Sequence, residues 1–303
     1  MMDSLIEEIA RLKKENNAVI LAHYYVNEEV QAIADYIGDS YYLSKIATKV
    51  EEDTILFCGV TFMGESAKIL NPTKRVLVPD MSADCPMAHM VDVNKIKEMR
   101  EKYIDLAVVC YINSTAELKT YADICVTSSN AIEIVKALPN RYIFFIPDEN
   151  LGRYVANQVP EKTFIFNDGF CHVHTSISKE NVLKAMAAKP SAKILVHPEC
   201  KLEILELADY IGSTSGIIDY ATQSEADEFI ICTEMGIEYE LKLKNPNKRF
   251  YSVGHRQFCP NMKRITLEKV RDTLLYGKNP VEIDEELRLK AKVPLNRMLE
   301  LAK

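Results

Sequence analysis

Three cysteines lie at almost equal intervals along the 303-residue chain. Cys171 follows Cys85 by 86 residues, and Cys259 follows Cys171 by 88. Each lies in a loop of turn-forming or polar residues, so each is available as a ligand. Three thiolates suit an iron–sulfur cluster. A [4Fe–4S] cluster held by three protein thiolates leaves one iron free to bind a substrate.

Two other interpretations of the three cysteines stay open at this point. Zinc held by the cysteines and one histidine is the first, with His172, His174 or His255 as the fourth ligand. Unliganded thiols are the second, and the spacing alone does not choose. The other five cysteines are Cys58, Cys110, Cys125 and Cys232 in apolar runs, which we interpret as small core residues, and Cys200 in a loop.

The interval of 86 to 88 residues recurs elsewhere, which indicates an internal repeat. Three further sets of residues are separated by 88 and then 86 residues. They are His23, Tyr111 and His197 after apolar runs; Ser40, Ser128 and Thr214 at small-residue turns; and Phe57, Phe145 and Ile231 inside apolar runs. Landmarks that keep one phase predict three copies of one supersecondary unit, and we divide the chain at 1–85, 86–171 and 172–303.

Apolar runs without strict alternation, separated by amphipathic helical segments, are typical of parallel sheets buried on both faces. We therefore predict an α/β protein of three pseudo-symmetric α/β/α sandwich domains around a central active site. The predicted strands are 18–22, 54–58, 75–78, 106–110, 124–126, 142–146, 163–166, 193–196, 210–211, 229–232 and 250–253. The predicted helices are 5–14, a segment through Val30 that ends at Gly38, 41–50, 62–70, 93–102, 130–138, 150–158, 179–188, 202–208, 236–244 and two that begin at Leu267 and Glu285. Ser114 and Glu117 have the spacing of a capping box.

Polar residues follow the strands in pairs, and ligands of parallel sheets bind beyond the carboxyl ends of the strands. The pairs are His23 with Tyr25, Tyr111 with Asn113, and His197 with Glu199. Residues two apart in extended chain point the same way, so these groups can converge for acid–base chemistry. The hydroxyl residues at 40, 128 and 214 are expected as helix N-caps, as ligands of an anion at helix N-termini, or as both.

The net charge of −7 argues against nucleic acid as a general partner. The first eight residues lack the features of a signal peptide, and no apolar stretch reaches the roughly 18 residues that a membrane span needs. We expect a cytoplasmic protein with no membrane partner, in which the cysteines stay reduced. The residues alone favour a cluster that acts as a Lewis acid on a small polyanion, as in a dehydratase or a condensing lyase.

The chain resembles the quinolinate synthases, bacterial and archaeal enzymes that make the pyridine precursor of NAD. The resemblance covers essentially the whole chain and is carried by residues 21–25, Leu-Ala-His-Tyr-Tyr; 37–40, Ile-Gly-Asp-Ser; 68–72, Lys-Ile-Leu-Asn-Pro; 111–115, Tyr-Ile-Asn-Ser-Thr; 196–200, Val-His-Pro-Glu-Cys; and 212–214, Gly-Ser-Thr. It implies three α/β/α domains around a [4Fe–4S] cluster. It also implies condensation of iminoaspartate with dihydroxyacetone phosphate, and an iminoaspartate-producing enzyme as the source of one substrate.

The same resemblance assigns roles to individual residues. Cys85, Cys171 and Cys259 match the cluster ligands, and Glu199 is the candidate for proton transfer, with Tyr25, His197 and Tyr111 as further catalytic candidates. The implied substrate-binding set is His23, Ser40, Tyr111, Asn113, Ser128, His174, His197, Glu199 and Thr214. The chain departs from the family at Tyr24, where many relatives have Asn, and in the segment 217–227.

Two rival functions follow from the same residues. A non-catalytic sensor, with three units around structural zinc, would bind an anion without turnover. A hydro-lyase would use the open iron on a hydroxy acid. Only the synthase requires both iminoaspartate and dihydroxyacetone phosphate.

Overall fold

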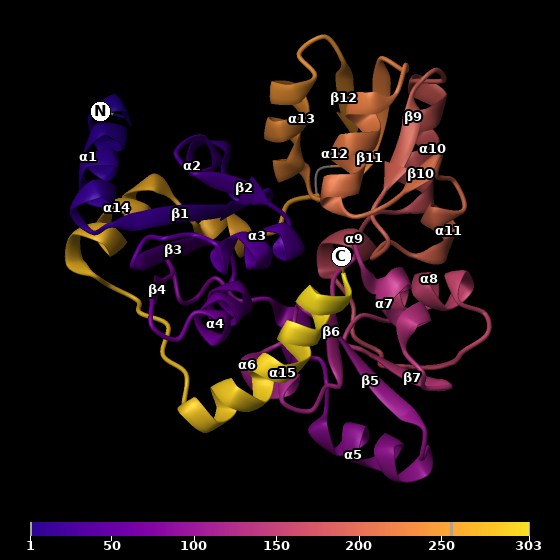
Figure 1. Cartoon of the computed structure of the whole chain (residues 1–303). Helices are drawn as coiled ribbons and strands as arrows, with labels where there is room; N and C mark the ends of the chain where they lie inside the picture. Colours follow the sequence, from indigo (N-terminus) through magenta and orange to yellow (C-terminus); the bar gives the residue numbers. More distant parts are fainter. Residues whose placement is uncertain (1, 255–256, 303) are drawn as a thin grey trace.

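Short, buried apolar runs form the central strands of three four-stranded sheets in the computed structural model, which describes residues 2–254 and 257–302 (Figure 1). All strand pairs within the three sheets are parallel. The first sheet contains β1 (Ala18–His23), β2 (Tyr36–Gly38), β3 (Thr54–Cys58) and β4 (Arg75–Leu77); the second contains β5 (Leu106–Tyr111), β6 (Ile124–Val126), β7 (Tyr142–Ile146) and β8 (Thr163–Phe166); the third contains β9 (Lys193–Val196), β10 (Tyr210–Ile211), β11 (Glu228–Cys232) and β12 (Arg249–Ser252). The predicted α/β class with three parallel sheets is confirmed.

The three sheets share one topology. The strand order is β2-β1-β3-β4, and the other two sheets repeat it as β6-β5-β7-β8 and β10-β9-β11-β12. Their registers agree as well, because Phe57, Phe145 and Ile231 each pair with the residue two positions before His23, Tyr111 or His197. The repeat read from the sequence is therefore a repeat of backbone pairing. The unit boundaries at residues 85 and 171 stay a prediction.

A partly exposed aspartate supports the central strand of each unit at the same phase of the repeat. Asp35, Asp123 and Asp209 each accept a hydrogen bond from a backbone N–H of the neighbouring central strand, at 2.8, 2.7 and 2.8 Å. Each also lies beside a cation, at 2.6 to 3.0 Å. Since these aspartates are separated by 88 and 86 residues, the interval could have revealed them in the sequence.

Helices connect the strands and cover the sheets (Figure 1). They are α1 (Met2–Glu15), α2 (Glu28–Ala32), α3 (Ser40–Ala47), α4 (Thr61–Leu70), α5 (Val93–Lys102), α6 (Ala116–Lys119), α7 (Ala131–Ala137), α8 (Glu149–Gln158), α9 (His172–Thr175), α10 (Lys179–Ala188), α11 (Leu202–Leu205), α12 (Thr214–Gln223), α13 (Glu238–Lys244), α14 (Leu267–Tyr276) and α15 (Glu285–Leu301). Short 3₁₀ helices are η1 (Pro86–His89), η2 (Met235–Ile237) and η3 (Met262–Arg264). Most predicted helices agree with these bounds to within a few residues.

Two local predictions are wrong. The helix expected to end at Gly38 stops at Ala32, and residues 36–38 form the edge strand β2 instead. The side chain of Asp35 bonds to Ile20 N–H, so a tertiary contact overrides the helical spacing. The expected capping box also fails, because Thr115 caps α6 and the Ser114 hydroxyl donates to the Tyr111 carbonyl.

The last two helices return to the beginning of the molecule. Helix α14 packs against α1, and α15 lies across α4, α6 and β6 (Figure 1). Within α15, Arg297 donates to the Asp123 carbonyl at 2.6 Å, and the Tyr41 hydroxyl donates to the Ala302 carbonyl just beyond it. The C-terminal helices thus bridge the first two sheets, although they follow the third in sequence.

Candidate active site

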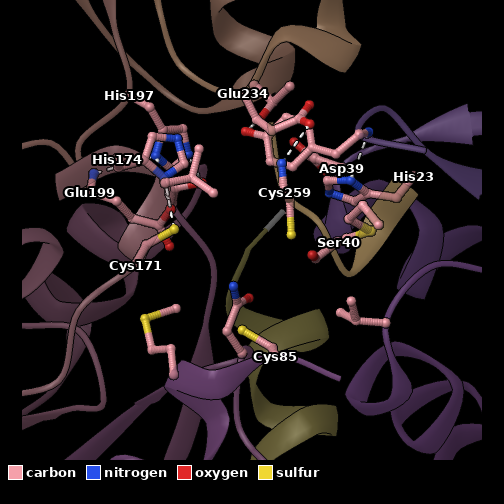
Figure 2. A pocket seen from close by; sticks show the side chains of 18 of the residues that line it. His23, Asp39, Ser40, Cys85, Cys171, His174, His197, Glu199, Glu234 and Cys259 are labelled. Atoms are coloured by element: carbon pink, nitrogen blue, oxygen red, sulfur yellow. Dashed lines mark hydrogen bonds and ion pairs between the residues drawn. The ribbon is translucent and has the colours of Figure 1, made fainter. Parts of the chain in front are cut away.

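The carboxyl ends of the central strands β1, β5 and β9 lead to one cavity between the three units. The residues to which the family resemblance assigned catalytic, substrate-binding or cluster-binding roles all line this cavity. They are His23, Tyr25, Ser40, Cys85, Tyr111, Asn113, Ser128, Cys171, His174, His197, Glu199, Thr214 and Cys259. Figure 2 shows several of them. The structure brings them together, and their individual roles stay predictions.

The three cysteines reach the cavity from equivalent loops. Cys85 precedes η1, Cys171 precedes α9, and Cys259 follows β12. Cys171 lies five residues after β8, whereas Cys259 lies seven after β12. This shorter second loop accounts for the order of the cysteine intervals, 86 and then 88, which is opposite to that of the other landmarks. Their sulfur atoms face the same space in Figure 2.

A carboxyl group accepts a hydrogen bond from the backbone N–H of each cysteine. The Cys171 N–H donates to Asp148 Oδ2 at 3.1 Å, the Cys259 N–H donates to Glu234 Oε1 at 3.0 Å, and the Cys85 N–H donates to Asp84 Oδ1 at 2.7 Å. Asp148 and Glu234 are fully buried and 86 residues apart. Sequence reasoning missed both, although the repeat interval could have found them.

Burial raises the pKa of all three cysteine thiols, that of Cys85 to about 12. Their thiolate forms would therefore need a nearby cation, which a bound metal centre would supply.

Glu199 is the centre of a buried polar cluster. Its Oε2 lies 2.7 Å from His174 Nδ1 and 3.5 Å from His197 Nδ1, and the two imidazole rings stack with centroids 4.6 Å apart. Burial opposes ionisation of Glu199, but the charges and hydrogen bonds of its neighbours, His174 first, lower its pKa to about 2. Its other oxygen, Oε1, is buried without a hydrogen-bond partner in the described part of the chain. Glu199 therefore presents a charged acceptor inside the cavity.

His23 and His197 have the same local geometry. The Tyr25 N–H donates to His23 Nδ1 at 3.2 Å, and the Glu199 N–H donates to His197 Nδ1 at 3.3 Å. Burial lowers the pKa of each histidine to about 3, so both rings are neutral at pH 7. Since Nδ1 accepts a hydrogen bond, the ring proton lies on Nε2. Each imidazole can thus donate one hydrogen bond from Nε2, and His197 Nε2 lies 3.3 Å from Ser128 Oγ.

The tyrosines remain protonated donors. Burial raises the pKa of Tyr25 and of Tyr111 well above the ordinary value. The Tyr25 hydroxyl crosses from the first unit to the third, where it lies 2.7 Å from Thr214 Oγ1 and 2.9 Å from Thr233 Oγ1. Thr233 was absent from the sequence predictions because no equivalent hydroxyl occurs at the other repeat positions, Gly59 and Pro147.

Ser40, Ser128 and Thr214 are not the N-cap residues that we predicted, because residues one or two positions away occupy the N-cap positions. Asp39 caps α3 and Ser213 caps α12, while Asn130 precedes α7. The hydroxyl groups of the three predicted residues are thus not used in capping, and all three line the cavity. This leaves the anion-binding interpretation as their predicted role.

Comparison with known proteins identifies the family. The family model described as "Quinolinate synthetase A protein" matches residues 7–300. The chain is 55% identical over 296 residues to the quinolinate synthase of Fusobacterium nucleatum, covering 98% of this chain and 99% of that one. The chain belongs to the quinolinate synthase family. Quinolinate synthases of Caldicellulosiruptor saccharolyticus and Clostridioides difficile are 52% and 50% identical, with coverage of 99% or more of each chain.

The cavity of this quinolinate synthase family member fits a sulfur-ligated metal centre. Three thiols from three loops line it, and Asn113 Oδ1 and Glu199 Oε1 are buried there without a partner among the described residues. Such orphaned oxygens suit a ligand that brings hydrogen-bond donors or a cation.

The residues that could hold a metal ion such as zinc differ from the predicted zinc ligands. Donor atoms of Cys171, His174 and Glu199 lie within 4.8 Å of one another, a Cys–His–Glu set in place of three cysteines and a histidine. Of the other predicted fourth ligands, His172 is exposed, and His255 lies outside the described residues.

The remaining cysteines lie in the core. Cys58, Cys110, Cys125 and Cys232 are fully buried in the strands or at their ends, as predicted. Cys200 is also fully buried, and its thiol donates to the Cys232 carbonyl. All eight cysteines are free thiols. In the described part of the chain, no helix has the length and apolar character required to cross a membrane.

Proposed function

We propose that this protein is a quinolinate synthase that condenses iminoaspartate with dihydroxyacetone phosphate, yielding quinolinate, phosphate and two waters. The observation that carries the proposal is the meeting of Cys85, Cys171 and Cys259 with the Glu199 cluster in one cavity. Family membership over nearly the whole chain supports it. The reaction belongs to NAD biosynthesis.

Cys85, Cys171 and Cys259 would hold a [4Fe–4S] cluster. When bound, this group supplies a Lewis-acidic iron with an open coordination position. The loops that carry Cys171 and Cys259 are held by Asp148 and Glu234, so the protein would orient these two ligands through backbone hydrogen bonds.

Substrate anions would bind between neutral donors. Nε2 of His23 and of His197 can each donate to a carboxylate or carbonyl oxygen, and Ser40 and Ser128 add hydroxyl donors at the starts of helices. Neutral donors can accommodate a polyanion in a chain whose net charge is −7.

Glu199 would hold and return a proton at Oε1 during the carbonyl isomerisation. A carboxyl with a pKa of about 2 is a weak base. A bound substrate with a negative charge beside it would raise this pKa and make Glu199 a stronger base. Tyr25 and Tyr111 stay protonated and would donate to developing negative charge, while His197 contacts the same carboxylate oxygen. His174 and Thr214 would orient Glu199 and Tyr25 and complete the substrate-binding set.

We also propose a cytoplasmic location and supply of iminoaspartate by an iminoaspartate-producing enzyme, since imines hydrolyse in water. The test begins with iron, sulfide and zinc content of anaerobically purified protein. About four irons and four sulfides per chain are expected for one [4Fe–4S] cluster. Quinolinate must then form only when both substrates are present. Stoichiometric zinc without turnover would refute the proposal, and turnover of a hydroxy acid alone would support the hydro-lyase instead.

A further inference from the structure

A fully buried lysine lies behind one wall of the cavity. Lys119 ends α6, and its ammonium group donates a hydrogen bond to the Ser114 carbonyl. The Ser114 hydroxyl in turn donates to the Tyr111 carbonyl at 2.9 Å. Lys119 thus braces the turn after β5, and this turn presents Tyr111 and Asn113 to the cavity, whereas Lys119 itself does not line it.

The first unit contains the same brace without a charge. Gln31 precedes Lys119 by 88 residues, which is the interval of the other landmarks, and it is also buried. Its amide nitrogen donates to the Val26 carbonyl at 3.0 Å, and Val26 precedes Ser114 by the same 88 residues. A neutral amide therefore holds the equivalent turn, so the brace alone does not require the positive charge of Lys119.

The charge of Lys119 is not offset by its surroundings. In the described part of the chain no carboxylate pairs with it, and its nitrogen lies 5.5 Å from the centre of the Phe62 ring, which lines the cavity. A hydrogen bond with Cys125 and then the charge of Lys119 lower the pKa of the Cys110 thiol at the end of β5. A buried ammonium group is costly without an opposite charge nearby. An anion in the cavity would supply that charge.

We infer that Lys119 determines specificity for anions: its buried charge, held behind the turn that carries Tyr111 and Asn113, makes the cavity prefer a dianion over a monoanion. The inference deepens the proposed function and rests on it for the identity of the ligands, since both proposed substrates and quinolinate are anions. Lys119 acts through its charge rather than by contact, and water screens a buried charge only weakly.

The size of the effect follows from Coulomb's law. With an effective dielectric constant of about 20, two unit charges about 10 Å apart change an affinity by roughly tenfold. Loss of the lysine charge should therefore weaken binding about tenfold for a monoanion and about 100-fold for a dianion. Because the charge attracts bound substrate and transition state alike, KM should rise while kcat changes by less than about threefold.

Three variants separate the charge from the brace. Lys119→Gln removes the charge and keeps a donor, as at Gln31, whereas Lys119→Met removes both and leaves no polar group to bury. Lys162→Met is the control, because Lys162 also donates to backbone carbonyls, those of Leu138 and Asn140. It directly precedes β8, at the end of the second sheet opposite the cavity. Both Lys119 variants should bind anions more weakly, and Lys162→Met should match wild type.

Calorimetric titration of anaerobically purified holoprotein measures these affinities without turnover. The probes are quinolinate, a dianion, and picolinate, the pyridine acid with a single carboxylate. Both Lys119 variants should lose about tenfold in affinity for picolinate and about 100-fold for quinolinate. Two variants of different chemistry keep the test open to refutation where one of them does not fold.

Wild-type affinity for quinolinate in the Lys119 variants would overturn the inference. Equal losses for the two probes would also overturn it, because a disturbed turn affects both ligands alike whereas a charge distinguishes them. Cys110→Ala protein should bind quinolinate as wild type does, since this thiol does not line the cavity. Tenfold tighter binding there would show that a Cys110 thiolate neutralises the lysine, which again contradicts the inference.

Failure of the proposed function is a separate outcome. Wild-type holoprotein that forms no quinolinate from the two substrates would refute that function. Titration with inorganic phosphate then decides the role of Lys119. Weaker phosphate binding by Lys119→Gln than by Lys162→Met would support the inference, and equal binding, or no phosphate binding by wild type, would overturn it.

Discussion

Replacement of Glu199 by glutamine tests the central chemical claim about the cavity. The side chain is 4% exposed, and its Oε2 lies 2.7 Å from His174 Nδ1. Glutamine has nearly the same shape and can still accept from His174 through its amide oxygen, so the fold and the cysteine loops should persist. The change removes the negative charge and the ability to hold a proton at Oε1.

The expected loss follows from those two properties. A positioned acid–base group typically contributes 10²- to 10⁴-fold to a rate, equivalent to about 3 to 5 kcal/mol of activation free energy. We therefore expect kcat for quinolinate formation to fall by roughly two to four orders of magnitude. The assay is quinolinate production with both substrates, on anaerobic protein whose iron and sulfide match wild type.

Glu203→Gln is the matched control, because Glu203 is an exposed carboxylate on α11, four residues away in sequence. It should leave kcat and iron content unchanged. A Glu199→Gln enzyme with full iron and a kcat within about threefold of wild type would refute the assignment of proton transfer to Glu199, since a general base is worth far more. Loss of iron in that variant alone would indicate a ligand role instead.

Cys171→Ser should lose iron and sulfide whereas Cys200→Ser should retain them, because only the Cys171 thiol lines the cavity. Analysis of iron and sulfide in both proteins, purified anaerobically, tests this prediction, and equal contents would contradict it. Asp123→Asn should lower the free energy of unfolding by about 1 to 3 kcal/mol, since its carboxylate binds Val108 N–H and Arg100, and urea titration measures the change. His23 has a pKa of about 3 in the folded protein and 6.5 when exposed. Between these pH values the unfolded chain binds one proton more than the folded chain, so the free energy of unfolding falls as the pH drops from 6.5 towards 3. His23→Gln should reduce the difference in unfolding free energy between pH 7 and pH 5, and an unaltered difference would show that His23 is not buried as a neutral ring.

Much of the site was accessible from spacing alone. The interval of 88 and 86 residues aligned His23, Tyr111 and His197, and the structure places all three at the carboxyl ends of equivalent central strands. This works because each unit repeats one parallel sheet, and a parallel sheet presents its strand ends at one edge. The pairing of Phe57 with the residue two before His23 shows the same regularity in the backbone.

Residues outside the repeat could not be found in this way. Thr233 has no counterpart in the repeat, and its two partners, Tyr25 and His174, are 208 and 59 residues away. The segment 33–38 has helical spacing but ends in the edge strand at 36–38, since Asp35 accepts a hydrogen bond from Ile20 N–H in a strand more than ten residues earlier. Local pattern cannot reveal contacts of this kind.

The sequence by itself determined the number of units, the parallel sheets and the set of side chains that meet in the cavity, because period and phase are carried by residue type. Tertiary structure alone decided which atoms touch: the His174–Glu199 contact, the crossing of Tyr25 into the third unit and the return of α15 over the first two sheets. Hydrogen bonds require approach within about 3 Å and a defined direction. Spacing along a chain carries neither, so only packing of the three units against one another settles them.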